Sequence, residues 1–152
     1  MLRDLRADQY GIRTFIEVDG VAIKFEIVRE ARIDLGGALD RTLGVPVLSR
    51  EDLFAEKLLA NADCSNDRST WSRDAIDLGM MVSHWGPVPA TAWEKARRAY
   101  GATIDAALAN AIRRLDEPAW LATCAQAMHL TPANAQRARD GLREIPGATP
   151  RA

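Results

Sequence analysis

The sequence predicts an α+β fold in which a small antiparallel β-sheet, with a hairpin at about residues 12–28, is followed by a helical bundle. Three observations predict this class. Residues 12–28 are rich in β-branched and aromatic residues around an Asp19-Gly20 dipeptide. From residue 49 onward apolar residues recur every three or four positions, the helical period. The 152 residues are 47% hydrophobic and 27% charged, an ordinary globular composition.

The chain length suits one domain, which we place at residues 1–145 with a β-rich part over 1–48 and a helical part over 49–145. We expect residues 146–152 to form a flexible tail. No apolar run approaches the ~20 residues that span a bilayer, so no membrane contact is expected. The charged amino terminus and two cysteines favour a cytoplasmic protein, and the two histidines lack the spacing of a zinc site.

The Asp19-Gly20 dipeptide most readily forms a two-residue type I′ turn. With that turn, residues whose numbers sum to 39 face each other across the hairpin. We expect one face to be the core, with these pairs: Val18 with Val21, Ile16 with Ile23, Thr14 with Phe25 and Ile12 with Ile27. The opposite face is mixed and pairs Arg13 with Glu26, so it is either solvent-exposed or the floor of a site.

Residues 29–48 contain several turn formers and read as a connection with one short strand around residues 45–48. Ser49 and Asp52 form a capping box that predicts a helix over about 50–62. Ser72 is a plausible N-cap for a helix that ends near Ser83.

Residues 89–115 repeat apolar side chains at the helical period, although Gly101 is expected to bend or break this helix. Two shorter helices should follow Asp116 and Thr131, because each is succeeded by a proline near the first turn. The half of the chain from residue 89 carries a net charge of +3, against −4 for residues 1–88. This mild basic excess is compatible with a solvated surface or with nucleic-acid contact.

Several charged residues fall on apolar faces. Asp74 and Asp77 share the half of their helix that carries Ile76, and Lys57 falls between two apolar positions of the preceding helix. A buried carboxylate needs a cation, hydrogen-bond donors or a raised pKa. Separate explanations exist for each: an Arg73–Asp77 ion pair, a lysine whose ammonium reaches water, and a cross-strand pair of Arg13 with Glu26. A single site that gathers Glu26, Lys57, Arg73 and Asp77 explains them together.

Such a set suits phosphoryl or nucleotidyl transfer. A strand carboxylate can hold Mg²⁺, which prefers oxygen ligands, and a lysine supplies a positive charge for a polyphosphate. In these reactions catalysis consists mostly of positioning and of neutralising charge on phosphate oxygens.

The wording of three segments resembles the second half of the AbiEii/AbiGii-type toxin nucleotidyltransferases: IEVDGVAIKFEIVRE, VPVLSREDLFAEKLLANAD and SRDAIDLGMM. The resemblance covers about residues 10–85 and continues more loosely through the helical remainder. It implies a polymerase-β-like nucleotidyltransferase fold, a toxin–antitoxin or abortive-infection context, and transfer of a nucleoside monophosphate from an NTP with Mg²⁺. It also implies an antitoxin partner and an RNA acceptor.

By this resemblance, Glu26, Lys57 and Asp77 are the catalytic candidates, and Glu26 is also the metal ligand. The R-D-x-x-D signature corresponds to Arg73, Asp74 and Asp77, and Lys57, Arg73 and Asp74 are expected to contact the nucleotide. Asp77 is the expected functional acid, with Arg73 as its orienting partner or a phosphate contact.

Two family features are missing, because nothing before Thr14 offers the Gly-Gly or Gly-Ser turn or the D-x-D acidic pair of the family. We therefore expect an incomplete, truncated domain that is inactive alone, or that is completed by an N-terminal segment or a partner chain. An exposed sheet edge would favour that partner or a homodimer. The alternative is a non-catalytic helical module that binds RNA or protein on the same scaffold.

Overall fold

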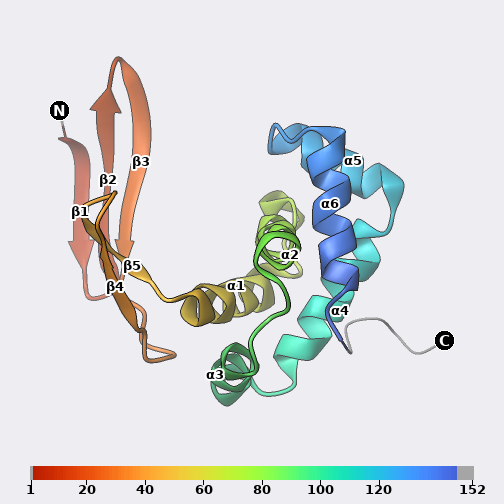
Figure 1. Cartoon of the computed structure of the whole chain (residues 1–152). Helices are drawn as coiled ribbons and strands as arrows, with labels where there is room; N and C mark the ends of the chain where they lie inside the picture. The colour runs from red at the N-terminus through yellow and green to blue at the C-terminus, as the bar shows by residue number, and fades with distance from the viewer. Residues whose placement is uncertain (1, 147–152) are drawn as a thin grey trace. The chain divides into compact units, whose positions relative to one another are not determined.

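The computed structural model describes the backbone of residues 2–146 and the side chains of residues 5–146. Over residues 2–146, five strands are followed by six α-helices and one short 3₁₀ helix, which confirms the predicted α+β class (Figure 1). The chain divides into two compact units, Met1–Asp34 and Leu35–Ala152, and each is described by itself. That the two act as one domain stays a prediction.

The first unit is a three-stranded antiparallel sheet of β1 (Leu2–Asp8), β2 (Gly11–Val18) and β3 (Val21–Val28) in the order β1-β2-β3. The predicted hairpin register is confirmed at every pair, from Val18 opposite Val21 to Ile12 opposite Ile27. Strand β1 was not predicted from the sequence. It joins β2 through a tight turn in which Asp8 Oδ1 accepts hydrogen bonds from the backbone N–H groups of Tyr10, at 2.7 Å, and Gly11, at 3.1 Å.

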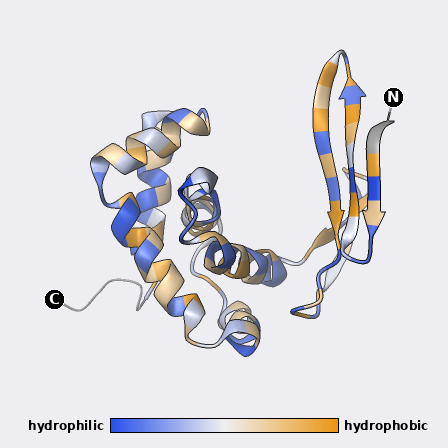
Figure 2. Cartoon of the chain, turned by 180° about the vertical axis from the view of Figure 1, so that it is seen from behind, coloured by the Kyte–Doolittle hydropathy of each residue, from blue (hydrophilic) through white to orange (hydrophobic). Residues whose placement is uncertain are grey.

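The prediction that this face of the hairpin forms the core is wrong. Apolar and polar residues do alternate along its strands (Figure 2). However, Thr14 is the one described side chain of this face that is buried, whereas Ile23 is 48% exposed and Ile27 is 54% exposed. The alternation specified which residues share a face, but a three-stranded sheet has no second layer of its own to cover that face.

The second unit begins with a two-stranded antiparallel hairpin of β4 (Gly37–Asp40) and β5 (Val45–Leu48). We had predicted only the second of these strands. Helix α1 (Arg50–Cys64) follows, and Ser49 Oγ accepts a hydrogen bond from the N–H of Asp52 at 3.1 Å, as the capping box predicted.

The Asp52 carboxylate is 2% exposed and also connects α1 to two other segments, a role that the capping motif did not indicate. It accepts a hydrogen bond from the N–H of Gly36 at 2.5 Å and forms an ion pair with Lys95 of helix α3 (Ala90–Tyr100). Burial alone would raise its pKa, but the hydrogen bonds from Lys95 and Gly36 outweigh burial and lower the pKa below the usual aspartate value.

After a short 3₁₀ helix, η1 (Arg68–Thr70), the remaining helices are α2 (Arg73–Trp85), α3 (Ala90–Tyr100), α4 (Thr103–Leu115), α5 (Pro118–Ala127) and α6 (Pro132–Arg143). The expected stretch over 89–115 is therefore two helices. Gly101 separates them with a φ of +59°, a left-handed conformation that glycine adopts without strain. Thr131 caps α6, because its Oγ1 accepts a hydrogen bond from the N–H of Asn134.

The core of this unit lies among α1, α2, α4 and α6. Its fully buried large apolar side chains are Phe54, Leu58, Leu59, Ile76, Leu78, Ile104, Leu108, Leu115 and Leu142. Helix α6 runs alongside α2 (Figure 1). The two backbones approach closely at Gly79 and Gly141, where a Cβ on Gly79 would lie 1.9 Å from the carbonyl oxygen of Ala138.

Candidate functional site

Lys57 of α1 lies between two aspartates of α2. Its Nζ is 3.0 Å from Asp74 Oδ1 and 2.6 Å from Asp77 Oδ2. The two acids are three residues apart and therefore lie on one side of α2. The structure thus brings together three of the predicted site residues, from two helices that pack against each other. We call Lys57, Arg73, Asp74 and Asp77 the Lys57 cluster.

The members of the Lys57 cluster differ in depth. The Asp74 side chain is 7% exposed, Lys57 33%, Asp77 44% and Arg73 62%. The inference that both acids point inward therefore holds fully for Asp74 and only partly for Asp77. The predicted Arg73–Asp77 pairing is wrong, since Lys57 pairs with Asp77, and Arg73 Nε lies 3.7 Å from Asp74 Oδ2.

Lys57 is a fixed positive charge at neutral pH. Burial alone would lower its pKa, but the hydrogen bonds to Asp77 and then Asp74 outweigh burial and raise the pKa above the usual lysine value. Lys57 is therefore suited to attract an anionic group and unsuited to act as a general base.

The backbone just before α2 has an unusual conformation. Trp71 and Ser72 both adopt left-handed conformations, with φ of 55° and 51°, which non-glycine residues adopt at a cost. Ser72 precedes α2 as predicted, but its hydroxyl makes no capping hydrogen bond within the helix. Instead, Ser72 Oγ accepts a hydrogen bond from Trp120 Nε1 at 3.1 Å, which ties the start of α2 to α5.

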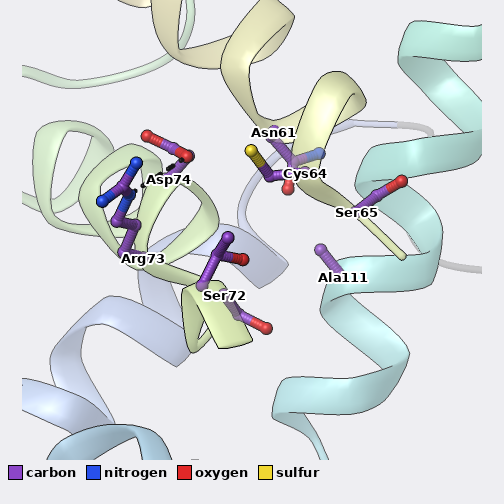
Figure 3. Close-up of a pocket in the computed structure, with 8 residues that line it drawn as sticks. Asn61, Cys64, Ser65, Ser72, Arg73, Asp74 and Ala111 are labelled. Carbon is purple, nitrogen blue, oxygen red and sulfur yellow. Dashed lines mark ion pairs between the residues drawn. The ribbon is translucent and has the colours of Figure 1, made fainter. Parts of the chain in front are cut away.

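A small cavity lies beside the buried end of the Lys57 cluster. Asn61 and Cys64 of α1, the first residues of α2 and Ala111 of α4 line it (Figure 3). Its volume is about 10 Å³, which suits a single water molecule and is far below the size of a nucleotide. A nucleotide could therefore reach the cluster only from the exposed side, where Asp77 and Arg73 lie.

Glu26 belongs to the first unit, on β3. Its carboxylate is 3.4 Å from Arg13 Nε and 3.1 Å from Lys24 Nζ, so the cross-strand pair given by the register is present. Because Glu26 and Lys57 lie in different units, their convergence on one site stays a prediction.

The described residues do not fit a Mg²⁺ site by themselves. Two cations already neutralise the carboxylate of Glu26, the predicted metal ligand. Over residues 5–146, no group of three or more histidine, cysteine, aspartate or glutamate side chains is arranged to hold a metal ion.

The mixed face of the sheet, which the sequence left open between solvent and site floor, carries a hollow of about 220 Å³. Arg6, Arg13, Lys24 and Phe15 are among the residues that line it. Arg6 and Arg13 are directly opposed across β1 and β2, and the carboxylates of Asp8 and Glu26, 3.3 Å and 3.4 Å from Arg13, compensate part of this like-charge repulsion. This cluster was not predicted, because Arg6 lies on β1, which the sequence pattern did not indicate.

Comparison with models of known protein families identifies the family of this chain. Residues 2–144 match the family described as nucleotidyl transferase AbiEii toxin, type IV TA system. The chain belongs to this AbiEii family. The match covers nearly the whole chain and so extends the resemblance seen over residues 10–85 through the helical part.

Membership in the AbiEii family gives a toxin–antitoxin context, with nucleotidyl transfer as the family's named activity and an antitoxin as the implied partner. Nucleotidyltransferases generally use an NTP and a divalent metal. No curated protein and no solved structure matches the chain significantly. Among the helices of the described residues, none combines the length and the apolar character needed to cross a membrane.

Proposed function

We propose that this chain takes part in NTP-dependent nucleotidyl transfer and that the Lys57 cluster contacts the triphosphate. The observation that carries the proposal is the placement of the R-D-x-x-D residues against Lys57 in a chain of the AbiEii family. In such a transfer, an acceptor hydroxyl attacks the α-phosphorus of the NTP and pyrophosphate leaves.

The cluster can bind phosphate on its exposed side. An ammonium has three N–H donors, and Asp74 and Asp77 accept from two directions around Lys57. The third donor is available to a phosphate oxygen, because Lys57 is one-third exposed. The guanidinium of Arg73 is mostly exposed and adds donors suited to phosphate geometry. Asp74 and Asp77 hold the ammonium in place.

We propose further that the metal-binding acids come from a polypeptide segment outside residues 1–152, in the same chain or a partner. This rests on the sequence, which has no D-x-D pair before the hairpin. Without those acids the 152 residues should bind an NTP weakly and transfer nothing, because residues that act as one unit lose activity together. Glu26 is the acid of this chain that we expect to join them.

Isothermal titration of the 152-residue protein with ATP, GTP, CTP and UTP, each with Mg²⁺, tests the contact. We expect at least one NTP to bind, and Lys57→Met and Asp77→Asn to weaken that binding about tenfold or more, as for loss of a charge-assisted hydrogen bond. Arg97→Met is the matched control, because Arg97 forms an exposed ion pair with Asp105. If no NTP binds, or if all variants bind alike, the proposal fails.

The hollow on the mixed sheet face favours a second candidate function, RNA binding without catalysis. Three cations lie around the partly exposed ring of Phe15, two of them paired with Glu26, and together with the ring they offer phosphate contacts and a stacking surface for a base. Fluorescence anisotropy with a labelled single-stranded RNA should then show salt-dependent binding that Arg6→Met and Phe15→Ala weaken, while Lys57→Met does not.

A further inference from the structure

A groove with a largely apolar lining lies between α5 and α6. Its volume is about 450 Å³, within the range of small-molecule sites. Leu121, Ala122 and Ala125 of α5, Leu130 of the connecting turn and Ala135 of α6 give it an apolar wall. It lies wholly within the second unit and shares no residue with the Lys57 cluster.

One charged side chain, Arg139 of α6, lines this apolar groove. It is 20% exposed, and its buried Nε atom has no hydrogen-bond partner. The nearest carboxylate oxygen, Asp140 Oδ1, is 3.7 Å from Nε, which is too far for a hydrogen bond. That oxygen already accepts a hydrogen bond from Gln136 Nε2 at 2.7 Å.

This placement of Arg139 is unfavourable, because its Nε donor has lost water without gaining a hydrogen-bond partner and its charge is compensated only by Asp140 at 3.7 Å. A ligand that carries a carboxylate would supply the acceptor, and its apolar body would cover the groove wall. Small apolar carboxylic acids meet both requirements, because they carry one anionic group and an apolar body.

We propose that the α5–α6 groove binds a small apolar carboxylic acid, whose carboxylate accepts hydrogen bonds from the Arg139 guanidinium and whose hydrocarbon part lies against Leu121, Ala125 and Ala135. The site is independent of the proposed nucleotide contact, because no residue is shared. A ligand here would add a binding activity to the helical part of the chain.

Octanoate is a suitable probe, with octan-1-ol as its uncharged counterpart. In ¹H–¹⁵N correlation spectra of the full chain, we expect octanoate to shift amides of α5 and α6. Arg139→Met should weaken octanoate binding about tenfold or more while leaving octan-1-ol binding unchanged, as for loss of hydrogen bonds to a charged group. Arg137→Met is the control, because Arg137 is exposed on the same helix and does not line the groove.

A second variant tests the cavity without touching the charge. Ala122 is exposed at the groove, so Ala122→Trp should fill the space, leave the fold intact and abolish binding of both probes. The proposal is overturned if octanoate shifts no α5 or α6 amide at millimolar concentration, or if Arg139→Met binds it like the wild type. It is also overturned if Ala122→Trp binds it unchanged, or if only a protein partner perturbs these amides.

Discussion

The Nζ atom of Lys57 lies 2.6 Å from Oδ2 of Asp77 and thereby joins a half-exposed acid to a buried one, since the same Nζ is 3.0 Å from Asp74. One cation thus neutralises two carboxylates in different surroundings. Removing the cation and removing the exposed acid should therefore affect stability very differently.

Lys57→Met should destabilise the protein by about 1–3 kcal/mol, because it leaves the Asp74 carboxylate, 7% exposed, without its closest cation. Asp77→Asn should change the free energy of unfolding by less than about 1 kcal/mol, because exposed ion pairs contribute little. Urea unfolding of the two variants at neutral pH measures both values. Equal losses in the two variants would contradict the difference in depth.

A double variant checks the stated cause. In Lys57→Met/Asp74→Asn the buried acid is neutral, so part of the lost stability should return. If the double variant is as unstable as the sum of its single changes, the unpaired carboxylate is not what destabilises Lys57→Met.

Asp52 should govern part of the acid sensitivity of the helical unit. Its pKa is lowered in the folded protein, so its contribution to stability is present above the ordinary aspartate value of 3.8 and is lost as pH falls through the lower folded value. Asp52→Asn should therefore be less stable than the wild type at pH 7, with a smaller further loss below about pH 4. Unfolding free energies between pH 3 and pH 7 measure this, with Glu144→Gln as an exposed control.

The strand register shows what sequence can specify. The Asp19-Gly20 turn fixes the pairing of β2 with β3, and the side-chain period of two does the rest. β1 escaped prediction because its pairing with β2 is irregular between Arg3 and Arg6, which interrupts the alternation that marks a strand. Whether another layer covers the apolar face depends on residues far away in the sequence, so the hairpin pattern could not predict it.

The Lys57 cluster was predictable in membership but not in depth. Helical periodicity placed Lys57, Asp74 and Asp77 on apolar sides of their helices, and the structure brings them together. Which acid is buried depends on how α1 crosses α2, and a helical wheel contains no such information. Arg139 gave no signal at all, because the missing hydrogen-bond partner of its Nε atom follows from the packing of α5 against α6.

Gly79 should be intolerant of any side chain. A Cβ there would lie 1.9 Å from the carbonyl oxygen of Ala138, and backbone cannot yield as a flexible side chain can. Gly79→Ala should therefore destabilise the protein by about 3 kcal/mol or more through separation of α2 from α6. Thermal and urea unfolding measure the loss. Ser83→Ala, at an exposed position of the same helix, is the control and should stay within about 0.5 kcal/mol of the wild type.

Cys124 should be unreactive in the folded protein. Burial raises the pKa of its thiol to about 11, against a smaller opposing effect of a hydrogen bond with Ser72, and the side chain is 0% exposed. Because the thiolate is the reactive form, at pH 8 its population should be roughly a hundredfold below that of an ordinary cysteine. Alkylation of Cys64→Ser with iodoacetamide, followed by mass spectrometry, isolates this residue. We expect little modification in buffer and complete modification in urea. Labelling in buffer at the rate of a free thiol would show that α5 opens readily from the core.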